Sequence, residues 1–213
     1  CSDIIVYRPT HFAEERLEVL YALMRERPFA TLVTQGKAGP GADHLPLHLT
    51  PNGRLQGHVA RANPIWRDAA DTDVLAIFHG PQAYVTPSWY ATKREHGKAV
   101  PTWNYAVAHA HGTLRVFEDA AALRSVVERL TERHEAGQPS PWRVSDAPTD
   151  YLEAMLQAIV GIELPIERIQ GKFKLSQNRG AADRTGAEAG LRDHPGCGDG
   201  AALADWMQRE VAR

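Results

Sequence analysis

Small and apolar residues alternate with polar residues between Ala106 and Phe117. In an extended chain one face would carry the small and apolar side chains of Ala106, Ala108, Ala110, Leu114 and Val116, and the other those of His109, His111, Thr113 and Arg115. A period of two predicts a half-buried strand and excludes a helix here. Because a strand buries one face only within a sheet, the pattern limits the chain to folds that contain sheets.

Further strands are predicted on both sides of this segment. They cover Phe29–Thr34, Leu45–Leu49, Leu55–Arg61, Val74–Phe78, Ala83–Thr86 and Gly161–Leu175, the last broken or bulged near Pro165 and Gly171. Turn sequences at Gly36–Gly41 and Pro51–Gly53 separate the first three. We therefore expect an antiparallel meander.

Helical patterns are few and lie between the strands. We expect helices after Thr10 (ended by Pro28), near Asn63–Pro64, after Asp119, from about Thr149 and over Ala201–Val211. Many strands with few helices indicate a mainly β (α+β) fold, a closed or partly closed antiparallel barrel with flanking helices. The expected domain covers residues 1–185, and residues 186–213 form a polar tail with a short helix.

Composition bounds the possible partners and the compartment. The chain has 213 residues, is 43% hydrophobic and carries a formal charge of −2, so its net charge does not attract DNA or an acidic membrane. The cysteines Cys1 and Cys197 are far apart, which favours a reducing compartment. The sequence contains neither a long apolar run nor the pattern of a signal peptide, so a cytoplasmic protein is expected.

The segment from residue 87 to 104 has no helix or strand period and is rich in aromatic and hydroxyl side chains. Aromatic rings can stack on a flat heterocycle while Ser, Thr and Asn bind its polar edge. Aromatic side chains that close the end of a barrel, or that contact another chain, would give the same composition. The residues alone do not decide among a ligand site, the closed end of a barrel and a contact with another chain.

Three other clusters carry candidate chemistry. His58–Pro64 ends a strand and enters a helix start, where Arg61 could hold a phosphate or simply be a surface cation. The basic cluster from Lys172 to Arg179 could face a cofactor, solvent or a nucleic acid. His109 and His111 share a strand face without a nearby acidic residue or cysteine, and no metal site is predicted.

Several motifs, in this order along the chain, resemble the PaiB family of FMN-binding negative transcriptional regulators. They are Asp43–Pro46, Gly57–Pro64, Tyr84–Tyr90, Val100–Tyr105 and Lys174–Asn178. The resemblance covers roughly residues 6–185. It implies a split β-barrel of the FMN-binding, pyridoxamine-phosphate-oxidase-like type, and a homodimer with FMN at the subunit interface. In such barrels the strand at His58–Asn63 supplies ring and phosphate contacts, and the loop at Pro87–Lys93 comes from the partner.

The resemblance and the clusters together give a set of cofactor-binding candidates. They are His58, Val59, Ala60, Arg61, Asn63, Ser88, Trp89, Tyr90, Lys93, Thr102, Trp103, Asn104, Lys174 and Gln177. No catalytic residue is assigned. The expected function is a negative transcriptional regulator or flavin-dependent sensor, and the alternative is an FMN-dependent oxidoreductase acting on a small molecule. Neither charge nor a recognisable helix-turn-helix supports direct DNA binding.

Overall fold

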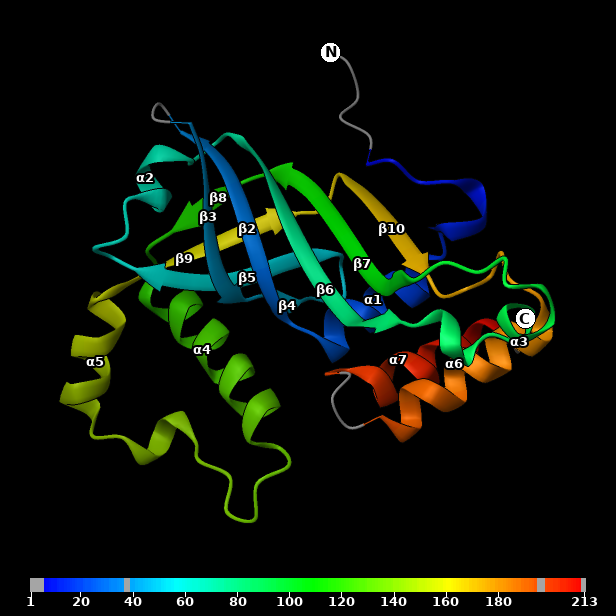
Figure 1. The fold of residues 1–213 in the computed structure, drawn as a ribbon. Coiled ribbons are helices and arrows are strands. Elements are labelled where there is room, and N and C mark those ends of the chain that lie inside the picture. Colours follow the sequence, from blue (N-terminus) through cyan, green and yellow to red (C-terminus); the bar gives the residue numbers. More distant parts are fainter. Residues whose placement is uncertain (1–5, 37–38, 195–197, 212–213) are drawn as a thin grey trace. The chain divides into compact units, whose positions relative to one another are not determined.

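A computed structural model describes residues 6–36, 39–194 and 198–211 (Figure 1). The two cysteines and the centre of the predicted turn at Gly36–Gly41 lie outside these residues. The chain divides into two compact units, each described by itself: unit 1 (residues 1–20, 79–108 and 170–213) and unit 2 (residues 21–78 and 109–169). Strands β6 (Asp73–Val85) and β7 (Thr102–Thr113) each begin in one unit and end in the other.

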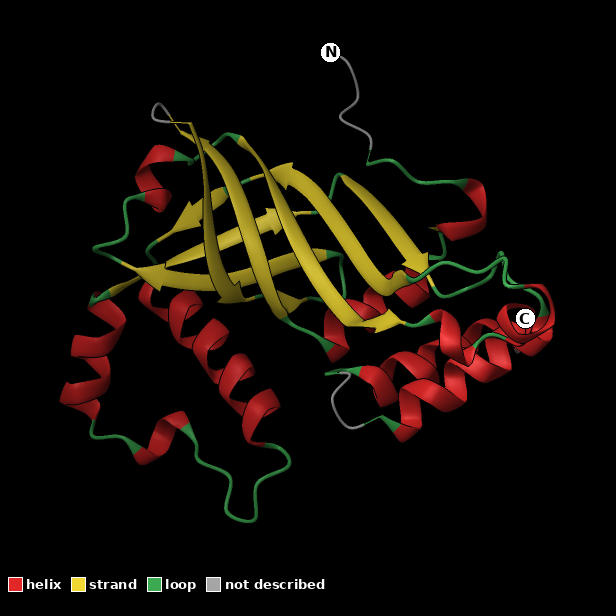
Figure 2. Ribbon diagram, in the orientation of Figure 1, coloured by secondary structure: helices red, strands yellow, loops and turns green. Residues whose placement is uncertain are grey.

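Unit 2 is built mainly from antiparallel strands (Figure 2). Its complete strands are β2 (Phe29–Gly36), β3 (Gly39–Pro46), β4 (His48–Leu49), β5 (Arg54–Ala60), β8 (Arg115–Phe117) and β9 (Ile159–Pro165). Strand β2 pairs with β3 on one side and with β6 on the other. The remaining strands form a second sheet in the order β4-β5-β9-β8.

Short helices accompany these sheets. They are α2 (Ile65–Asp68), α4 (Ala120–Glu135), the 3-10 helix η3 (Val144–Asp146) and α5 (Thr149–Gln157), while α1 (Leu17–Glu26) enters unit 2 from unit 1. The Asp119 side chain accepts a hydrogen bond from the Ala122 backbone N–H at 2.8 Å and so caps α4, as predicted. Helix α4 then buries Leu123, Val126 and Leu130.

Unit 1 combines strands with the chain's C-terminal helices. It contains η1 (Thr10–Phe12), β1 (Ala13–Glu14), η2 (Pro87–Trp89), α3 (Ala91–His96), most of β10 (Arg168–Lys174), α6 (Ala181–Asp193) and α7 (Gly200–Val211). Strand β1 pairs antiparallel with β10. Helices α6 and α7 pack against each other (Figure 1). Trp206 of α7 contacts Phe173 of β10 edge to face at 5.2 Å between ring centroids.

The mainly β fold with flanking helices is confirmed, and strands lie at the predicted segments with four changes of boundary. The predicted strand Leu45–Leu49 is divided between β3 and β4, and Ala106–Phe117 is divided between β7 and β8. The predicted meander of the first three strands is wrong, since β5 pairs with β4 and β9 in the second sheet. Val74–Phe78 and Ala83–Thr86 belong to one continuous strand, β6, and the last predicted strand is two strands, β9 and β10, that separate after Pro165. Since proline cannot donate a ladder hydrogen bond, a break at this position is expected. Helix α7 also lies where the sequence predicts it.

Three local predictions are wrong. The first helix begins at Leu17, not after Thr10, because Glu14 pairs with Gly171 in the sheet and its carboxylate accepts hydrogen bonds from the backbone and side chain of Arg16. The segment from residue 87 to 104 is not structureless, since it contains η2 and α3. Helix α6 was not predicted at all. Its glycines weaken the helical pattern, and packing against neighbours stabilises the helix instead.

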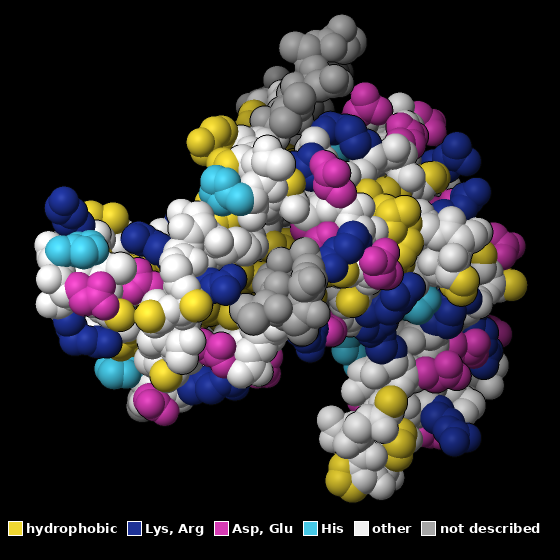
Figure 3. All heavy atoms as spheres, turned by 90° about the vertical axis from the view of Figure 1, so that its right-hand side faces the viewer, with side chains coloured by type: hydrophobic (Ala, Val, Ile, Leu, Met, Phe, Trp, Pro, Cys, Tyr) yellow, Lys and Arg dark blue, Asp and Glu magenta, His cyan; other side chains and the backbone are white. Residues whose placement is uncertain are grey.

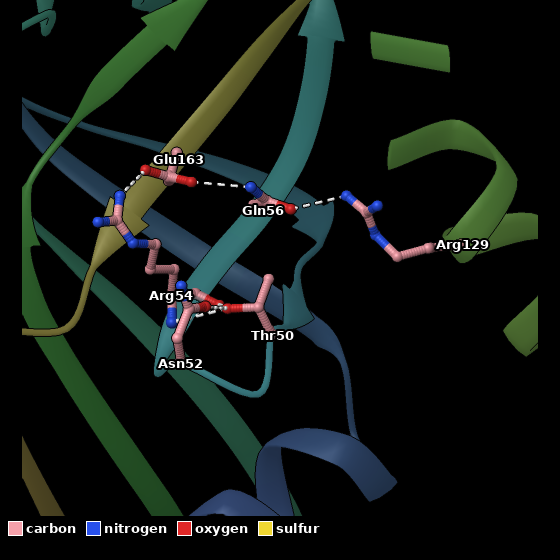
Figure 4. A network of polar contacts seen from close by, with 6 residues as sticks. All are labelled: Thr50, Asn52, Arg54, Gln56, Arg129 and Glu163. Carbon is pink, nitrogen blue, oxygen red and sulfur yellow. Dashed lines mark hydrogen bonds and ion pairs between the residues drawn. The ribbon is translucent and has the colours of Figure 1, made fainter. Parts of the chain in front are cut away.

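A polar network joins two strands of unit 2 to α4 (Figure 4). The Glu163 carboxylate on β9 forms an ion pair with Arg54 on β5 and accepts a hydrogen bond from Gln56 Nε2 at 2.8 Å. The side-chain amide oxygen of Gln56 (Oε1) in turn accepts a hydrogen bond from Arg129 of α4 at 2.8 Å. The amide orientation of Gln56 is therefore fixed from both sides.

Glu163→Ala should destabilise the protein by about 1–3 kcal/mol, because Arg54 and Gln56 would both lose their acceptor in a partly buried place. Denaturant unfolding measures the change. The matched control is Glu128→Ala, which breaks the exposed pair with Arg124 on α4 and should cost at most about 0.5 kcal/mol. Equal losses for both variants would contradict a special role of the network.

Candidate functional site

The segment after β6 is held in place by its own polar groups. The Thr86 hydroxyl accepts a hydrogen bond from the Ser88 backbone N–H at 3.3 Å and caps η2. Thr92 at the start of α3 donates from its backbone N–H at 3.0 Å and from its hydroxyl at 2.7 Å to the buried Asp183 carboxylate of α6. These bonds connect the aromatic segment to the C-terminal helices.

Trp89 lies against two glycines of α6. A Cβ atom added at Gly190 would lie 2.2 Å from the Trp89 ring, and one added at Gly186 would lie 2.0 Å from the Trp89 carbonyl oxygen. Since atoms do not approach this closely, only glycine lets the helix and Trp89 meet here. The His194 ring at the end of α6 contacts Trp89 edge to face at 5.4 Å.

These elements border an open cavity of about 680 Å³ in unit 1. Its described lining consists of Gln82, Ala83, Tyr84, Thr86, Trp89, Trp103, His194, Gly198 and Asp199. The rings of Tyr84 and Trp103 lie 6.2 Å apart at 71°, and they are 45% and 56% exposed. Two large aromatic rings with this much open surface are ready to contact a ligand or a second chain.

Two lysines of the candidate set are held by hydroxyl groups. Lys93 donates to the Ser88 hydroxyl at 3.0 Å, and Lys174 of β10 donates to the hydroxyl of Thr102, which precedes Trp103 in β7. Burial lowers the pKa of Lys174, and the positive charges of Lys172 and Arg179 lower it further. A bound anion would relieve this repulsion, so the cluster is suited to a phosphate.

Three candidates of unit 1 are engaged within the protein itself. Tyr90 and Asn104 are fully buried, and Asn104 donates to the Ser176 hydroxyl at 2.8 Å. The Gln177 side chain binds backbone groups of Leu175 at 2.7 Å and Phe173 at 2.6 Å, and thereby shapes the chain after β10. The described hydrogen bonds of Asn104 and Gln177 therefore stabilise the structure of unit 1.

The candidates at the end of β5 lie in unit 2. Arg61 forms an ion pair with Glu118 and donates to the backbone carbonyls of Gln157 at 2.7 Å and Ile159 at 3.1 Å. Its guanidinium therefore already has three acceptors. Val59 is buried, whereas Ala60 is exposed.

Asn63 and His58 complete this group. Asn63 donates to the Asp43 carboxylate at 2.6 Å and accepts a hydrogen bond from the Ile65 backbone N–H at 3.0 Å, two residues before α2 begins. Burial lowers the pKa of His58, whose Nδ1 has no hydrogen-bond partner within the described residues. A neutral imidazole with one nitrogen to spare can still bind a polar ligand group.

Comparison with known proteins identifies the family. A family model described as "Putative FMN-binding domain" matches residues 6–168. The protein "Protease synthase and sporulation protein PAI 2" of Bacillus subtilis is 36% identical over 182 residues, covering 84% of this chain and 85% of that protein. The chain belongs to the PaiB family of FMN-binding proteins.

Two other matches are a further relative and a solved structure. The "Uncharacterized protein AN0679" of Emericella nidulans is 36% identical over 221 residues, covering 85% of the PaiB-family chain and 88% of that protein. Among solved structures, the flavocytochrome Anf3 of Azotobacter vinelandii matches with a TM-score of 0.62 and 15% identity, covering 79% of this chain and 72% of that one. The match with Anf3 shows a shared fold and confirms the split β-barrel.

The PaiB-family chain has residues suited to the FMN cofactor that its family assignment supports. A volume of about 680 Å³ lies within the range of about 300–1,000 Å³ typical of small-molecule sites, and aromatic rings line it. Lys172, Lys174 and Arg179 supply positive charge in the same unit. When bound, FMN supplies hydride and electron transfer, and the protein's residues orient it.

Sequence reasoning missed part of the lining in this PaiB-family chain. His194, Gly198 and Asp199 lie beyond residue 168, where the family match ends, and follow a helix that the sequence did not predict. Their separation from Trp89 by about a hundred positions left no local signal.

Within residues 6–36, 39–194 and 198–211, no helix has the length and apolar character needed to span a membrane. Those residues also contain no group of three or more potential metal ligands.

Gly190→Ala should destabilise the protein by about 1–3 kcal/mol, because the new Cβ overlaps the Trp89 ring. Denaturant unfolding followed by tryptophan fluorescence measures the loss. Gly137→Ala is the matched control, since a Cβ there would meet nothing within 4 Å. If both variants unfold at the same denaturant concentration as the wild type, Trp89 does not lie against α6 as described.

Proposed function

We propose that the aromatic cavity of unit 1 binds the isoalloxazine ring of FMN. The observation that carries this proposal is that Trp89 and Trp103, both candidates from the sequence, line one cavity of ligand size. Stacking on an aromatic wall suits a flat heterocycle, and the side chains of Gln82, Thr86 and His194 offer donors and acceptors to its rim. Tyr90 and Asn104, which follow Trp89 and Trp103 in sequence, are buried in the core.

The phosphate of FMN would bind to Lys174 and the hydroxyl of Thr102. Following the family resemblance, we propose that Lys93 and the hydroxyl of Ser88 bind the FMN of a partner subunit. The resemblance also gives FMN contacts to the segment from His58 to Asn63, and we include Gln177. Arg61 would be available only if it exchanged one of its present acceptors.

A homodimer is part of this proposal. In unit 2 four outward positions of β2 and β6 carry the apolar residues Phe29, Val33, Leu75 and Ile77, and Val33 lies opposite Leu75 in the sheet. The other outward positions carry the polar residues Thr31, which lies opposite Ile77, Gln35 and Asp73. Phe29 is 63% exposed. The solvent face of an antiparallel sheet is normally polar, so an apolar one indicates that another surface covers it.

The function we favour is that of a negative transcriptional regulator or flavin-dependent sensor in the cytoplasm. Basic and acidic side chains are mixed on the face that Figure 3 draws, which agrees with the net charge of −2 and argues against a broad DNA-binding surface there. Regulation without direct DNA contact therefore fits this chain better.

One observation favours an FMN-dependent oxidoreductase as the second candidate. The cavity includes the exposed imidazole of His194, a group that can donate or accept a proton beside a bound substrate. Bleaching of the flavin absorption band by NADH or NADPH, with turnover of an added acceptor, would favour the enzyme. Specific and salt-resistant retardation of a promoter fragment would favour a regulator that contacts DNA.

Lys174→Met should weaken FMN binding about tenfold or more, which corresponds to the loss of about 1.5–3 kcal/mol for a charge-assisted hydrogen bond. Fluorescence titration of the apoprotein measures this. Riboflavin, which lacks the phosphate, should bind the variant and the wild type equally, and Lys98→Met on the exposed surface should change neither affinity. If the wild type takes up no FMN, the site assignment fails; equal weakening for both ligands would remove Lys174 from the phosphate.

Ile77→Glu should dissociate the proposed homodimer, because it places a carboxylate at the centre of the apolar outward face. Sedimentation velocity should show a monomer with an unchanged circular dichroism spectrum. Gln138→Glu adds the same charge to an exposed loop and should leave the dimer intact. A wild type that is monomeric at all concentrations would contradict the proposal.

A further inference from the structure

Ser176 combines burial with an unusual backbone conformation, and the proposed FMN contacts do not include it. It follows the end of β10 by two residues, and only 3% of its surface is exposed. Its φ of +65° lies in the left-handed region, which residues with a Cβ rarely adopt. Asp71 is the other described non-glycine residue with a positive φ, and it is exposed. A strained residue persists where the surrounding structure holds it, and such residues gather at functional sites.

Neighbouring groups hold Ser176 in this conformation. The Gln177 side chain accepts a hydrogen bond from the Leu175 backbone N–H at 2.7 Å and donates one to the Phe173 carbonyl at 2.6 Å. On the other side, the Arg179 backbone N–H donates to the Ser176 carbonyl at 2.9 Å. Glycine adopts a positive φ without strain, so the backbone alone gives no reason for a serine here. What distinguishes serine at this position is its hydroxyl group.

The Ser176 hydroxyl fixes the residue that follows Trp103. It accepts a hydrogen bond from Asn104 Nδ2 at 2.8 Å, and Asn104 is fully buried. The same nitrogen lies 3.9 Å from the Met207 sulfur, a weak acceptor, and the Asn104 amide oxygen has no hydrogen-bond partner within the described residues. Since successive side chains of β7 point to opposite faces, the bond that anchors Asn104 inward also sets the direction of Trp103 outward.

The same turn contacts the residue that follows Trp89. The Arg179 guanidinium lies over the ring of the fully buried Tyr90, 4.9 Å from its centroid. A cation over an aromatic face is attracted by the ring, and removal from water strengthens the attraction. The turn Ser176–Arg179 therefore contacts the neighbours of both tryptophans, and all of these residues belong to unit 1.

We propose that Ser176 is a positioning residue of the FMN site, an inference that rests on the proposed function of the aromatic cavity. Its hydroxyl orients Trp103 through Asn104. Its backbone starts the turn that carries Arg179, and this turn supports Trp89. Ser176 is not among the described residues that line the cavity, so it acts on the flavin ring through the two tryptophans. A flat ring stacks well only on aromatic walls that are held in place by their own supports.

The test compares flavin binding in two variants of the full chain. Ser176→Ala removes the hydroxyl and keeps the strain, whereas Ser176→Gly removes both. We expect each variant to bind FMN about three- to tenfold more weakly, as for the loss of one hydrogen bond. Riboflavin should weaken by the same factor, because the stacking of the ring and not the phosphate contact is affected. Ser140→Ala in an exposed loop is the matched control and should bind both flavins like the wild type.

Stability separates positioning from a general structural role. Because glycine relaxes the left-handed backbone, Ser176→Gly should be at least as stable as Ser176→Ala in denaturant unfolding and yet bind flavin no better. The fluorescence of bound FMN, which stacking on tryptophan quenches, should rise in both variants. Combining Ser176→Ala with Asn104→Ala should lower the affinity no further than Asn104→Ala alone, since the two residues act through one hydrogen bond.

The possible results distinguish this inference from the proposed function. A wild type that takes up no FMN refutes the proposed function, and the role of Ser176 with it. If the wild type binds FMN, the role of Ser176 alone is overturned when its variants bind flavin with unchanged affinity and fluorescence. It is also overturned when Ser176→Gly recovers wild-type binding together with stability. Should Ser176→Ala fail to fold, Ser176→Gly takes its place, because its backbone is not strained.

Discussion

The strict alternation of β7 is the constraint on which the rest of the structure depends. Because side chains of a strand point to opposite faces in turn, the inward positions of β7 hold small side chains and its outward positions hold Trp103, Tyr105 and His109. A shift of one residue would bury Trp103 and expose the alanines. The same register places Asn104 in the core, where the hydrogen bond that its amide nitrogen donates to Ser176 offsets part of the cost of burying the amide.

The sequence reveals elements that follow such a period and misses those that depend on distant contacts. The strand at Phe29 and the capped helix after Asp119 carry their signals locally, and both were predicted correctly. Helix α6 carries glycines that argue against a helix, yet Gly186 and Gly190 are required for contact with Trp89. That requirement exists only once two segments about a hundred residues apart have met.

The candidate site shows the same division. Aromatic composition and family motifs were enough to select Trp89 and Trp103, and the structure brings both to one cavity. The role of His194 could not be predicted, because it follows from the contact of α6 with the aromatic segment. The partners of Arg61 could not be predicted either. Arg61 binds Glu118 and two backbone carbonyls of its own unit, and these groups are far away in sequence.

Whether a cationic side chain is free to bind an anion depends on whether its hydrogen-bond acceptor within the protein is charged or neutral. Arg16, Arg54 and Arg61 pair with carboxylates, so their charge is compensated within the fold. Lys174 is instead held by the Thr102 hydroxyl, which fixes the position of the ammonium group without compensating its charge. In a chain with a net charge of −2, anion recognition must come from such local arrangements.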